Sequence, residues 1–299
     1  MCKITIFTPT YNRAKTIEKL YYSLQKQTFK DFEWVIVDDG SNDETKKKIN
    51  LFINEHNFFP IVYIKQENLG KHVAINNGVS TAKGDLFFIV DSDDFLNEKS
   101  LERIVYWEGT IKNKEDFAGI GGLKCHYNGY DLGTTFSGDF IDATSLDRSK
   151  YHINGVKAEV FFTKILKEFP FPVFVGEKFL TEAVVWYRIA SKGYKIRWFN
   201  EKIYFCEYLN DGLSVATGKF KKNFQGFELY VFELIKYKQT PIIQKIKMIG
   251  SYGAIARCNS TRKKSFYESS KKIGVNYFLL ILFSLLASAY EYLILRRKI

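Results

Sequence analysis

Four short apolar runs at the start of the chain, separated by segments with helical spacing, constrain the fold most strongly. The runs cover residues 4–7, 34–37, 61–64 and 86–90. Near-continuous hydrophobicity is typical of buried strands that helices cover on both faces, and strands that alternate with helices pair in parallel through right-handed crossovers. We therefore expect an α/β fold, built on a doubly wound and mostly parallel sheet.

The whole chain divides into three parts by composition. A helix is expected over residues 181–192, and strand-like runs follow at 196–199 and 203–205. The pattern then changes near residue 216 to helical segments with basic clusters. We predict an α/β domain over residues 1–215, a helical basic extension over 216–272 and an apolar C-terminal helix over 273–299.

Composition and charge limit the class of protein. With 299 residues, 46% of them hydrophobic, the chain can bury one large core or one core and a smaller appendage. A net charge of +11 favours nucleic acid, an anionic membrane surface or phosphorylated substrates as partners. The four cysteines and four histidines are scattered and form no C-x-x-C pair, so no zinc site of familiar spacing is expected. The first residues lack the apolar segment of a signal peptide, which predicts a cytoplasmic location.

A polar cluster follows each of the four apolar runs. The clusters are residues 8–13, 38–41, 68–71 and 91–94. Because the carboxyl ends of parallel strands line the ligand crevice of an open sheet, we expect the four clusters to form one site.

The acidic cluster carries the most specific chemistry. Asp91 and Asp93 offer hard oxygen ligands for Mg²⁺ or Mn²⁺, which can also bind the oxygens of a diphosphate. If the strand end stays extended, both side chains leave it on the same side. Asp93 is the preferred direct ligand. The alternative is that Asp93 or Asp94 caps a helix beginning near Glu98.

The sequence does not contain other common nucleotide-binding motifs. Gly70-Lys71 lacks the upstream glycine of a Walker loop, and residues 119–122 lack the third glycine of a dinucleotide fingerprint. No G-x-S-x-G nucleophile elbow is present.

The four clusters, together with Asn76-Asn77-Gly78, resemble the motifs of the family 2 glycosyltransferases in order and spacing. The resemblance covers about residues 3–215. It implies a GT-A fold and inverting transfer of a sugar from a nucleotide-activated donor, with a UDP-sugar expected. The expected acceptor is a hydroxyl group of a saccharide or a lipid-linked saccharide, as in assembly of a bacterial surface polysaccharide.

Seven residues are expected to contact the nucleotide-sugar: Pro9, Thr10, Tyr11, Asp39, Lys71, Asp91 and Ser92. The resemblance implies that the first three border the base and ribose, that Asp39 accepts a hydrogen bond from the base and that Asp91 contacts ribose or sugar. It also implies that Asp93 holds the Mn²⁺ or Mg²⁺ ion. Taken alone, Asp39 reads as a turn residue and Lys71 as an exposed lysine at a helix start.

The catalytic base is expected to be Glu182, which precedes a helix containing Trp186. A carboxylate there can accept the proton that the acceptor hydroxyl loses on attack. The family often shows an acidic pair at this position, and this sequence has Ala183 as the second residue. Glu177 and Asp211 are the reserve candidates. Alternatively, Thr181 caps the helix and Glu182 only favours its positive end.

The C-terminal apolar run over residues 277–290 lies between basic clusters. It falls short of the roughly 20 residues that span a bilayer. We expect a helix that lies on a membrane surface or joins two copies of the chain, with the enzyme peripheral on the inner face of the cell membrane in the first case. The alternative is a helix packed on the protein core.

Two other functions remain open. A sugar-phosphate nucleotidyltransferase could use a similar acidic site, and would release pyrophosphate. A basic membrane- or nucleic-acid-binding module would not need the crevice at all, and the crowded aspartates argue against nucleic acid there.

Overall fold

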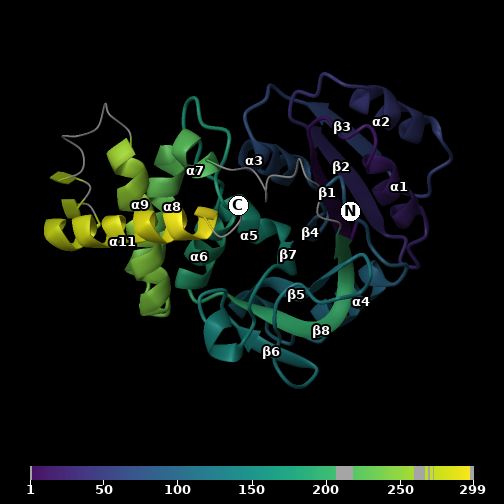
Figure 1. The fold of residues 1–299 in the computed structure, drawn as a ribbon. Coiled ribbons are helices and arrows are strands. Elements are labelled where there is room, and N and C mark those ends of the chain that lie inside the picture. The colour runs from purple at the N-terminus through teal and green to yellow at the C-terminus, as the bar shows by residue number, and fades with distance from the viewer. Residues whose placement is uncertain (1, 207–217, 259–266, 269, 272, 297–299) are drawn as a thin grey trace.

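The computed structural model describes residues 2–206, 218–258, 267–268, 270–271 and 273–296. In this part of the chain, eight strands form one mixed sheet in the order β3-β2-β1-β4-β7-β5-β8-β6 (Figure 1). The strands are β1 (Ile4–Thr10), β2 (Phe32–Asp38), β3 (Ile61–Lys65), β4 (Leu86–Ile89), β5 (Phe117–His126), β6 (Phe140–Ala143), β7 (Lys157–Phe162) and β8 (Lys195–Cys206).

The helices follow the strands along most of the chain. They are α1 (Ile17–Gln25), α2 (Thr45–Asn54), α3 (Lys71–Thr81), α4 (Ser100–Gly109), α5 (Thr163–Glu168), α6 (Ala183–Ser191), α7 (Lys219–Lys222), α8 (Phe224–Lys236), α9 (Ile242–Cys258) and α11 (Tyr277–Arg296), with short 3₁₀ turns at Lys114–Asp116 and Arg148–Tyr151.

The predicted α/β sheet is confirmed, and its first four strands are all parallel. β1 pairs in parallel with β2 and β4, and β2 pairs in parallel with β3. The second half is mixed, because β7 runs antiparallel to both β4 and β5, and β6 runs antiparallel to β8. The runs at 196–199 and 203–205 belong to one long strand, β8. All four parallel strands end at the same edge of the sheet.

Helices cover both faces of the parallel half. Tyr21 of α1 and Phe52 of α2 stack together over Trp34 of β2. Phe7 of β1 points to the other face, where its ring lies against Gly78 of α3. The expectation that all four apolar runs are buried strands is wrong for β3, whose side chains are partly exposed because β3 forms the edge of the sheet.

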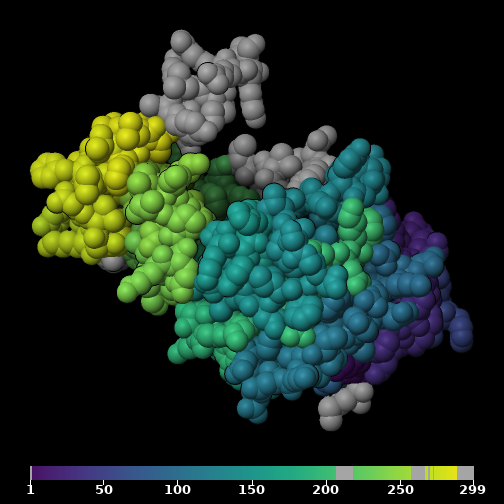
Figure 2. All heavy atoms as spheres, turned by 90° about the horizontal axis from the view of Figure 1, so that it is seen from below, coloured from purple at the N-terminus to yellow at the C-terminus, as the bar shows by residue number. Residues whose placement is uncertain are grey.

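The C-terminal helices build a second, smaller core beside the sheet. Phe224, Phe227 and Val231 of α8 pack with Tyr252 of α9 and Leu280 of α11. These helices form a lobe at one end of the molecule, drawn in green to yellow (Figures 1 and 2). The predicted boundary between residues 215 and 216 lies outside the described residues, so the three-part division stays a prediction. Among the described helices, none is long and apolar enough to cross a membrane.

Gly78 lets α3 approach β1 closely, and this sets the position of the whole helix. A Cβ atom at Gly78 would lie 2.2 Å from Cε2 of the buried Phe7 ring. We expect Gly78→Ala to lower the free energy of unfolding by about 1–3 kcal/mol, because overpacking outweighs the better helix propensity of alanine. Urea denaturation measures this change.

Gly109 supplies the matched control. It is also helical, and a Cβ there would meet no atom within 4 Å. Gly109→Ala should leave stability unchanged or raise it by up to about 1 kcal/mol. Equal effects of the two substitutions would contradict the close approach of α3 to β1.

Lys157, at the start of β7, gives the fold a measurable pH dependence. Its Nζ donates to the Asn154 carbonyl at 2.7 Å. Burial, and then the nearby Arg148 guanidinium, lower the pKa of Lys157 to about 8 from an ordinary 10.5. Between these values the unfolded chain binds more protons than the folded one, so this group's contribution to the free energy of unfolding rises with pH.

We therefore expect wild-type protein to gain stability relative to Lys157→Met between pH 8 and about pH 10, by on the order of 1 kcal/mol. Urea denaturation of both proteins across this range measures the gain. Stability curves that stay parallel would contradict the lowered pKa.

Candidate active site

The first two polar clusters are bonded to each other at the carboxyl ends of β1 and β2. The Asp39 N–H donates to the Thr10 carbonyl at 2.8 Å, and the Asn12 N–H donates to Oγ of Ser41 at 2.9 Å. Asn12 has a positive φ of 53°, which turns the chain out of β1 toward this contact. The loops after the two strands therefore form one hydrogen-bonded wall at this edge of the sheet.

Asp39 joins the third cluster to this wall. Its Oδ1 accepts from the Leu69 N–H at 2.8 Å, and its Oδ2 accepts from the Gly70 N–H at 2.9 Å. Oδ1 also accepts from Nε2 of Gln66 at 2.7 Å. These donors lie just before α3, where backbone N–H groups have no partner within the helix. Asp39 thus anchors the start of α3, a role that its reading as an isolated turn residue does not include.

Gly70 is required at this junction. Its φ of +100° favours glycine, and a Cβ there would lie 2.1 Å from the backbone oxygen of Lys178. The helix that begins at Lys71 is therefore fixed from two sides, by Asp39 and by the chain around Lys178.

Lys71 brings two of the predicted site residues together. Its Nζ lies 2.7 Å from Oδ1 of Asp91 and 3.0 Å from Oε1 of Glu182. Burial alone would lower the pKa of Lys71, but the two carboxylates outweigh it and raise that pKa. Burial would also raise the pKa of Asp91, yet Lys71 and then Lys124 hold it at about 2. A residue of α3, a residue of the turn after β4 and the N-cap residue of α6 thus meet in one charged cluster.

A buried network beneath Asp91 was not predicted from the sequence. Nζ of Lys124 lies 3.0 Å from Oδ2 of Asp94 and 3.9 Å above the ring of Tyr204. The Tyr204 hydroxyl donates to Oδ2 of Asp94 at 2.7 Å and accepts from the Asp91 N–H at 2.9 Å. Burial is the main cause that raises the pKa of Asp94 to about 6. A lysine within the apolar strand β5 was the one sequence signal for this network.

The backbone from Asp91 to Asp94 turns, so the expectation that the strand end stays extended is wrong. The Asp94 N–H donates to the Asp91 carbonyl at 3.1 Å. The turn directs Asp91 and Asp94 to the two lysines. Neither Asp93 nor Asp94 caps the next helix, because α4 begins at Ser100 without a side-chain cap.

Asp93 has the properties of a cation ligand. Its carboxylate lies 3.9 Å from Nε of Arg13 and is partly exposed. Burial, and then the Asp91 charge, raise the pKa of Asp93, so a bound cation would relieve an unfavourable charge. No group of three or more His, Cys, Asp or Glu gathers around a metal position in the described residues. One carboxylate plus phosphate oxygens and water is a donor set that Mg²⁺ accepts, so Asp93 fits this role.

The candidates for the base differ in their surroundings. Glu182 is the N-cap residue of α6, but its side chain makes no cap hydrogen bond and pairs with Lys71 instead. Glu177 accepts from the backbone N–H groups of Gln225 and Gly226 at 2.7 and 2.8 Å, so both its oxygens are occupied at the start of α8. Asp211 lies outside the described residues.

Two buried side-chain atoms of the described residues lack a hydrogen-bond partner, and both belong to the strand-end clusters or to α3. They are Oγ1 of Thr10 and Nδ1 of His72. Burial lowers the pKa of His72, which favours the neutral imidazole. Unpaired buried polar atoms are costly, and a bound ligand could satisfy them. His72 was not among the predicted site residues.

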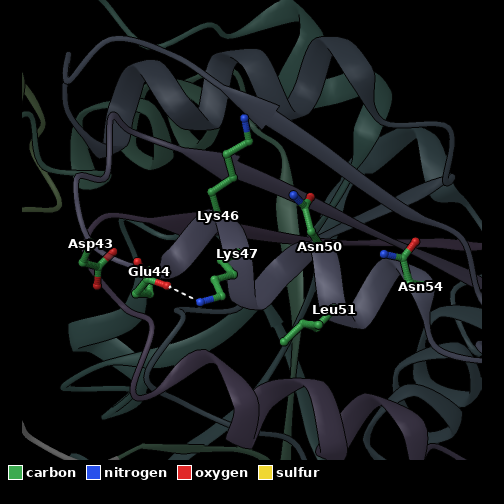
Figure 3. A pocket seen from close by; sticks show the side chains of 7 residues that line it. All are labelled: Asp43, Glu44, Lys46, Lys47, Asn50, Leu51 and Asn54. Carbon is green, nitrogen blue, oxygen red and sulfur yellow. Dashed lines mark ion pairs between the residues drawn. The ribbon is translucent and has the colours of Figure 1, made fainter.

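The remaining predicted residues lie at or just after the ends of β1 and β4. Pro9 is partly buried in β1, Tyr11 is 45% exposed just after it and Ser92 is buried in the turn. A separate hollow runs along α2 and is lined by Asp43, Glu44, Lys46, Lys47, Asn50, Leu51 and Asn54 (Figure 3). It contains none of the predicted site residues.

Comparison with known sequences places the N-terminal part of the chain in a family. Residues 5–108 match the family described as Glycosyl transferase family 2. The glycosyltransferase GlyG of Streptococcus pneumoniae serotype 4 is 35% identical over 102 residues, which are 34% of this chain and 33% of GlyG. A GalNAc(5)-diNAcBac-PP-undecaprenol β-1,3-glucosyltransferase of Campylobacter jejuni is 25% identical over 302 residues, which cover 96% of this chain and 94% of that protein.

Solved structures share the fold. Staphylococcus aureus TarS 1–349 in complex with UDP-GlcNAc superposes with a TM-score of 0.62 at 21% identity, over 89% of this chain and 75% of that one. The mannosyltransferase PcManGT of Pyrobaculum calidifontis in complex with GDP-Man and Mn²⁺ gives a TM-score of 0.58 at 16% identity, over 96% and 87%.

The mixed sheet matches the GT-A fold of these solved glycosyltransferase structures. Residues 5–108 match Glycosyl transferase family 2, and over this segment the match confirms the resemblance seen in the motifs. The matched segment spans about a third of the length of GlyG.

Tyr204 tests the buried network. Tyr204→Phe leaves the Asp94 carboxylate and the Asp91 N–H each without the tyrosine hydroxyl. We expect the free energy of unfolding to fall by about 1–3 kcal/mol, as for other buried groups that lose a partner. Tyr106→Phe, at a residue that is 52% exposed, is the control and should change stability by less than about 0.5 kcal/mol. Equal urea denaturation midpoints for both variants would contradict the network.

Proposed function

We propose that the chain is an inverting glycosyltransferase that moves a sugar from a nucleotide-sugar, expected to be a UDP-sugar, to an acceptor hydroxyl group. The observation that carries the proposal is the pairing of Lys71 with both Asp91 and Glu182. The Lys71 ammonium group thereby holds the expected sugar-contacting carboxylate, Asp91, and the expected base, Glu182, in one cluster. Lys71 and Asp91 lie within the segment that matches Glycosyl transferase family 2.

The donor would bind along the wall formed by the loops after β1 and β2. The Thr10 hydroxyl, which has no partner, lies at the end of β1 and could bond the nucleoside. Asp39 would accept a hydrogen bond from the base through Oδ2, which accepts only the Gly70 N–H within the described structure. Because a carboxylate oxygen can accept two hydrogen bonds, Asp39 can keep α3 anchored while it binds the base.

Asp93 would hold Mn²⁺ or Mg²⁺ against the diphosphate. The bound ion supplies charge stabilisation for the departing nucleoside diphosphate. Asp91, fixed by Lys71 and by the Tyr204 hydroxyl, would orient the ribose or the donor sugar. The solved structure of PcManGT with GDP-Man and Mn²⁺ supports divalent metal use in this fold.

Glu182 would accept the proton of the attacking hydroxyl. Its position at the N-terminus of α6 and its contact with Lys71 hold the carboxylate at the rim of the charged cluster, where it is about one third exposed. A single displacement by the acceptor hydroxyl would invert the configuration at the anomeric carbon. Such a step needs one group to accept the proton, which is the role proposed for Glu182.

The acceptor is proposed to be a saccharide or a lipid-linked saccharide of a surface polysaccharide. The relative from Campylobacter jejuni, which aligns over nearly the whole chain, is a glucosyltransferase acting on an undecaprenol-diphosphate-linked saccharide by its name. TarS of Staphylococcus aureus, whose UDP-GlcNAc complex shares the fold, supports a UDP-sugar donor.

Glu182→Gln tests the base. We expect kcat to fall by about 10²–10⁴-fold with unchanged donor binding, because the amide cannot accept the proton. Release of UDP or GDP from a panel of nucleotide-sugars and saccharide acceptors measures turnover, and calorimetry measures binding. Glu168→Gln, at an exposed position ending α5, is the control and should be fully active. Full turnover by folded Glu182→Gln would contradict the assignment of Glu182 as the base.

Glu177→Gln separates the two described base candidates. Glu177 stabilises the start of α8, so we expect its amide variant to lose stability but to keep most of its activity. A loss of turnover in Glu177→Gln at least as large as in Glu182→Gln would move the base to Glu177.

Asp93→Asn and metal removal test the cation site. We expect nucleotide affinity to fall about tenfold or more in the variant, and to fall in wild-type protein when EDTA replaces Mn²⁺. Asp116→Asn, in an exposed 3₁₀ turn, is the control and should bind as wild type. Release of pyrophosphate instead of a nucleoside diphosphate would indicate nucleotidyl transfer, and failure of every nucleotide to bind would overturn the proposal.

A further inference from the structure

The net positive charge of the protein comes from its C-terminal segment. Residues 216–299 contain sixteen of the 44 Lys and Arg but four of the 33 Asp and Glu. The preceding 215 residues therefore carry 28 basic and 29 acidic side chains and are nearly neutral. Catalysis in the crevice does not explain this separation, because the basic residues lie in the helical part of the chain.

The same segment exposes a row of large apolar side chains on α11. Phe278 is 77% exposed, Leu282 is 49% exposed and Leu285 is 51% exposed, at helical spacings that place them on one face. Leu279 and Leu286, at 46% and 58%, widen this face. We call these five residues the α11 apolar face.

The opposite side of α11 is fixed to α9. Leu280 and Ser284 are fully buried. Gly250 and Gly253 of α9 permit this contact, since a Cβ at either would come within 2.7 Å of the Phe283 oxygen or of Cβ of Ser284. The α11 apolar face is thus held outward on a rigid support, at the outer edge of the lobe (Figure 2).

We propose that the α11 apolar face inserts into the interfacial region of an anionic lipid bilayer, with basic residues of the same lobe against lipid head groups. A helix that lies in this region buries its apolar side chains among acyl chains, and basic residues beside it gain from the negative surface potential. Lys271 and Lys247 are exposed basic residues of the same lobe. Tyr277 is the first residue of α11. Tyrosine side chains are enriched at membrane–water interfaces, so this residue is compatible with the proposed location.

Charge favours a bilayer over a second copy of the chain. Pairing of two α11 apolar faces would bring two strongly basic segments together, and like charges repel. An anionic surface instead neutralises them. The proposal does not depend on the transferase activity, because binding to lipid needs neither a nucleotide-sugar nor an acceptor.

Vesicle flotation of the full chain tests the proposal. We expect binding to phosphatidylcholine vesicles that contain phosphatidylglycerol, and much weaker binding to phosphatidylcholine alone or at high salt. The double variant Leu282→Glu and Leu285→Glu should bind the anionic vesicles at least about tenfold less, since it loses apolar burial and adds negative charge.

The matched control is Leu51→Glu with Ile53→Glu, on α2 at the other end of the molecule. These side chains are 54% and 40% exposed, so the control makes the same chemical change outside the lobe, and it should bind as wild type. Circular dichroism confirms that both variants fold.

Three outcomes would overturn the proposal. Wild-type protein could fail to float with anionic vesicles, or the Leu282→Glu and Leu285→Glu variant could float as well as the control. In the third, wild-type protein is a dimer that only this variant dissociates and that does not bind vesicles, which would make a second copy the occupant of the face.

Discussion

Two partly buried ammonium groups and three carboxylates meet at the carboxyl ends of the parallel strands, and the balance between their charges organises the site. Lys71 pairs with Asp91 and Glu182, while Lys124 pairs with Asp94. Buried charges are tolerated only when they are paired and hydrogen-bonded. The elements that carry these groups must therefore meet, which fixes α3, α6 and β5 around the end of β4. Asp93 lies beside Arg13 at the edge of the cluster and is the proposed ligand for a cation.

The anchoring of α3 shows how the fold serves this balance. Asp39 bonds the backbone ahead of Lys71, and Gly78 lets the helix lie against β1. Both features act on the same helix, one at its start and one near its end. The position of the Lys71 ammonium follows from them, and with it the position of the proposed base.

The sequence predicted the parallel strands well, because each is a short apolar run followed by a polar cluster. It also gave Lys71, Asp91 and Glu182 as candidate site residues, although it gave no reason for the three to touch. The Lys124 and Tyr204 network was missed because these residues lie on β5 and β8, far along the chain from Asp94. The turn at Asp91 was missed as well, since its shape depends on the two lysines that hold the carboxylates.

The sequence by itself determined the class of the fold, the residues at the strand ends and the separation of charge between the two parts of the chain. These features depend on local spacing and composition, which the chain carries in any conformation. Only the tertiary structure decided which carboxylates pair with the two lysines and which face of α11 is open to solvent. Those properties depend on contacts between residues that are distant in sequence, and on how much water each charge loses when the chain folds.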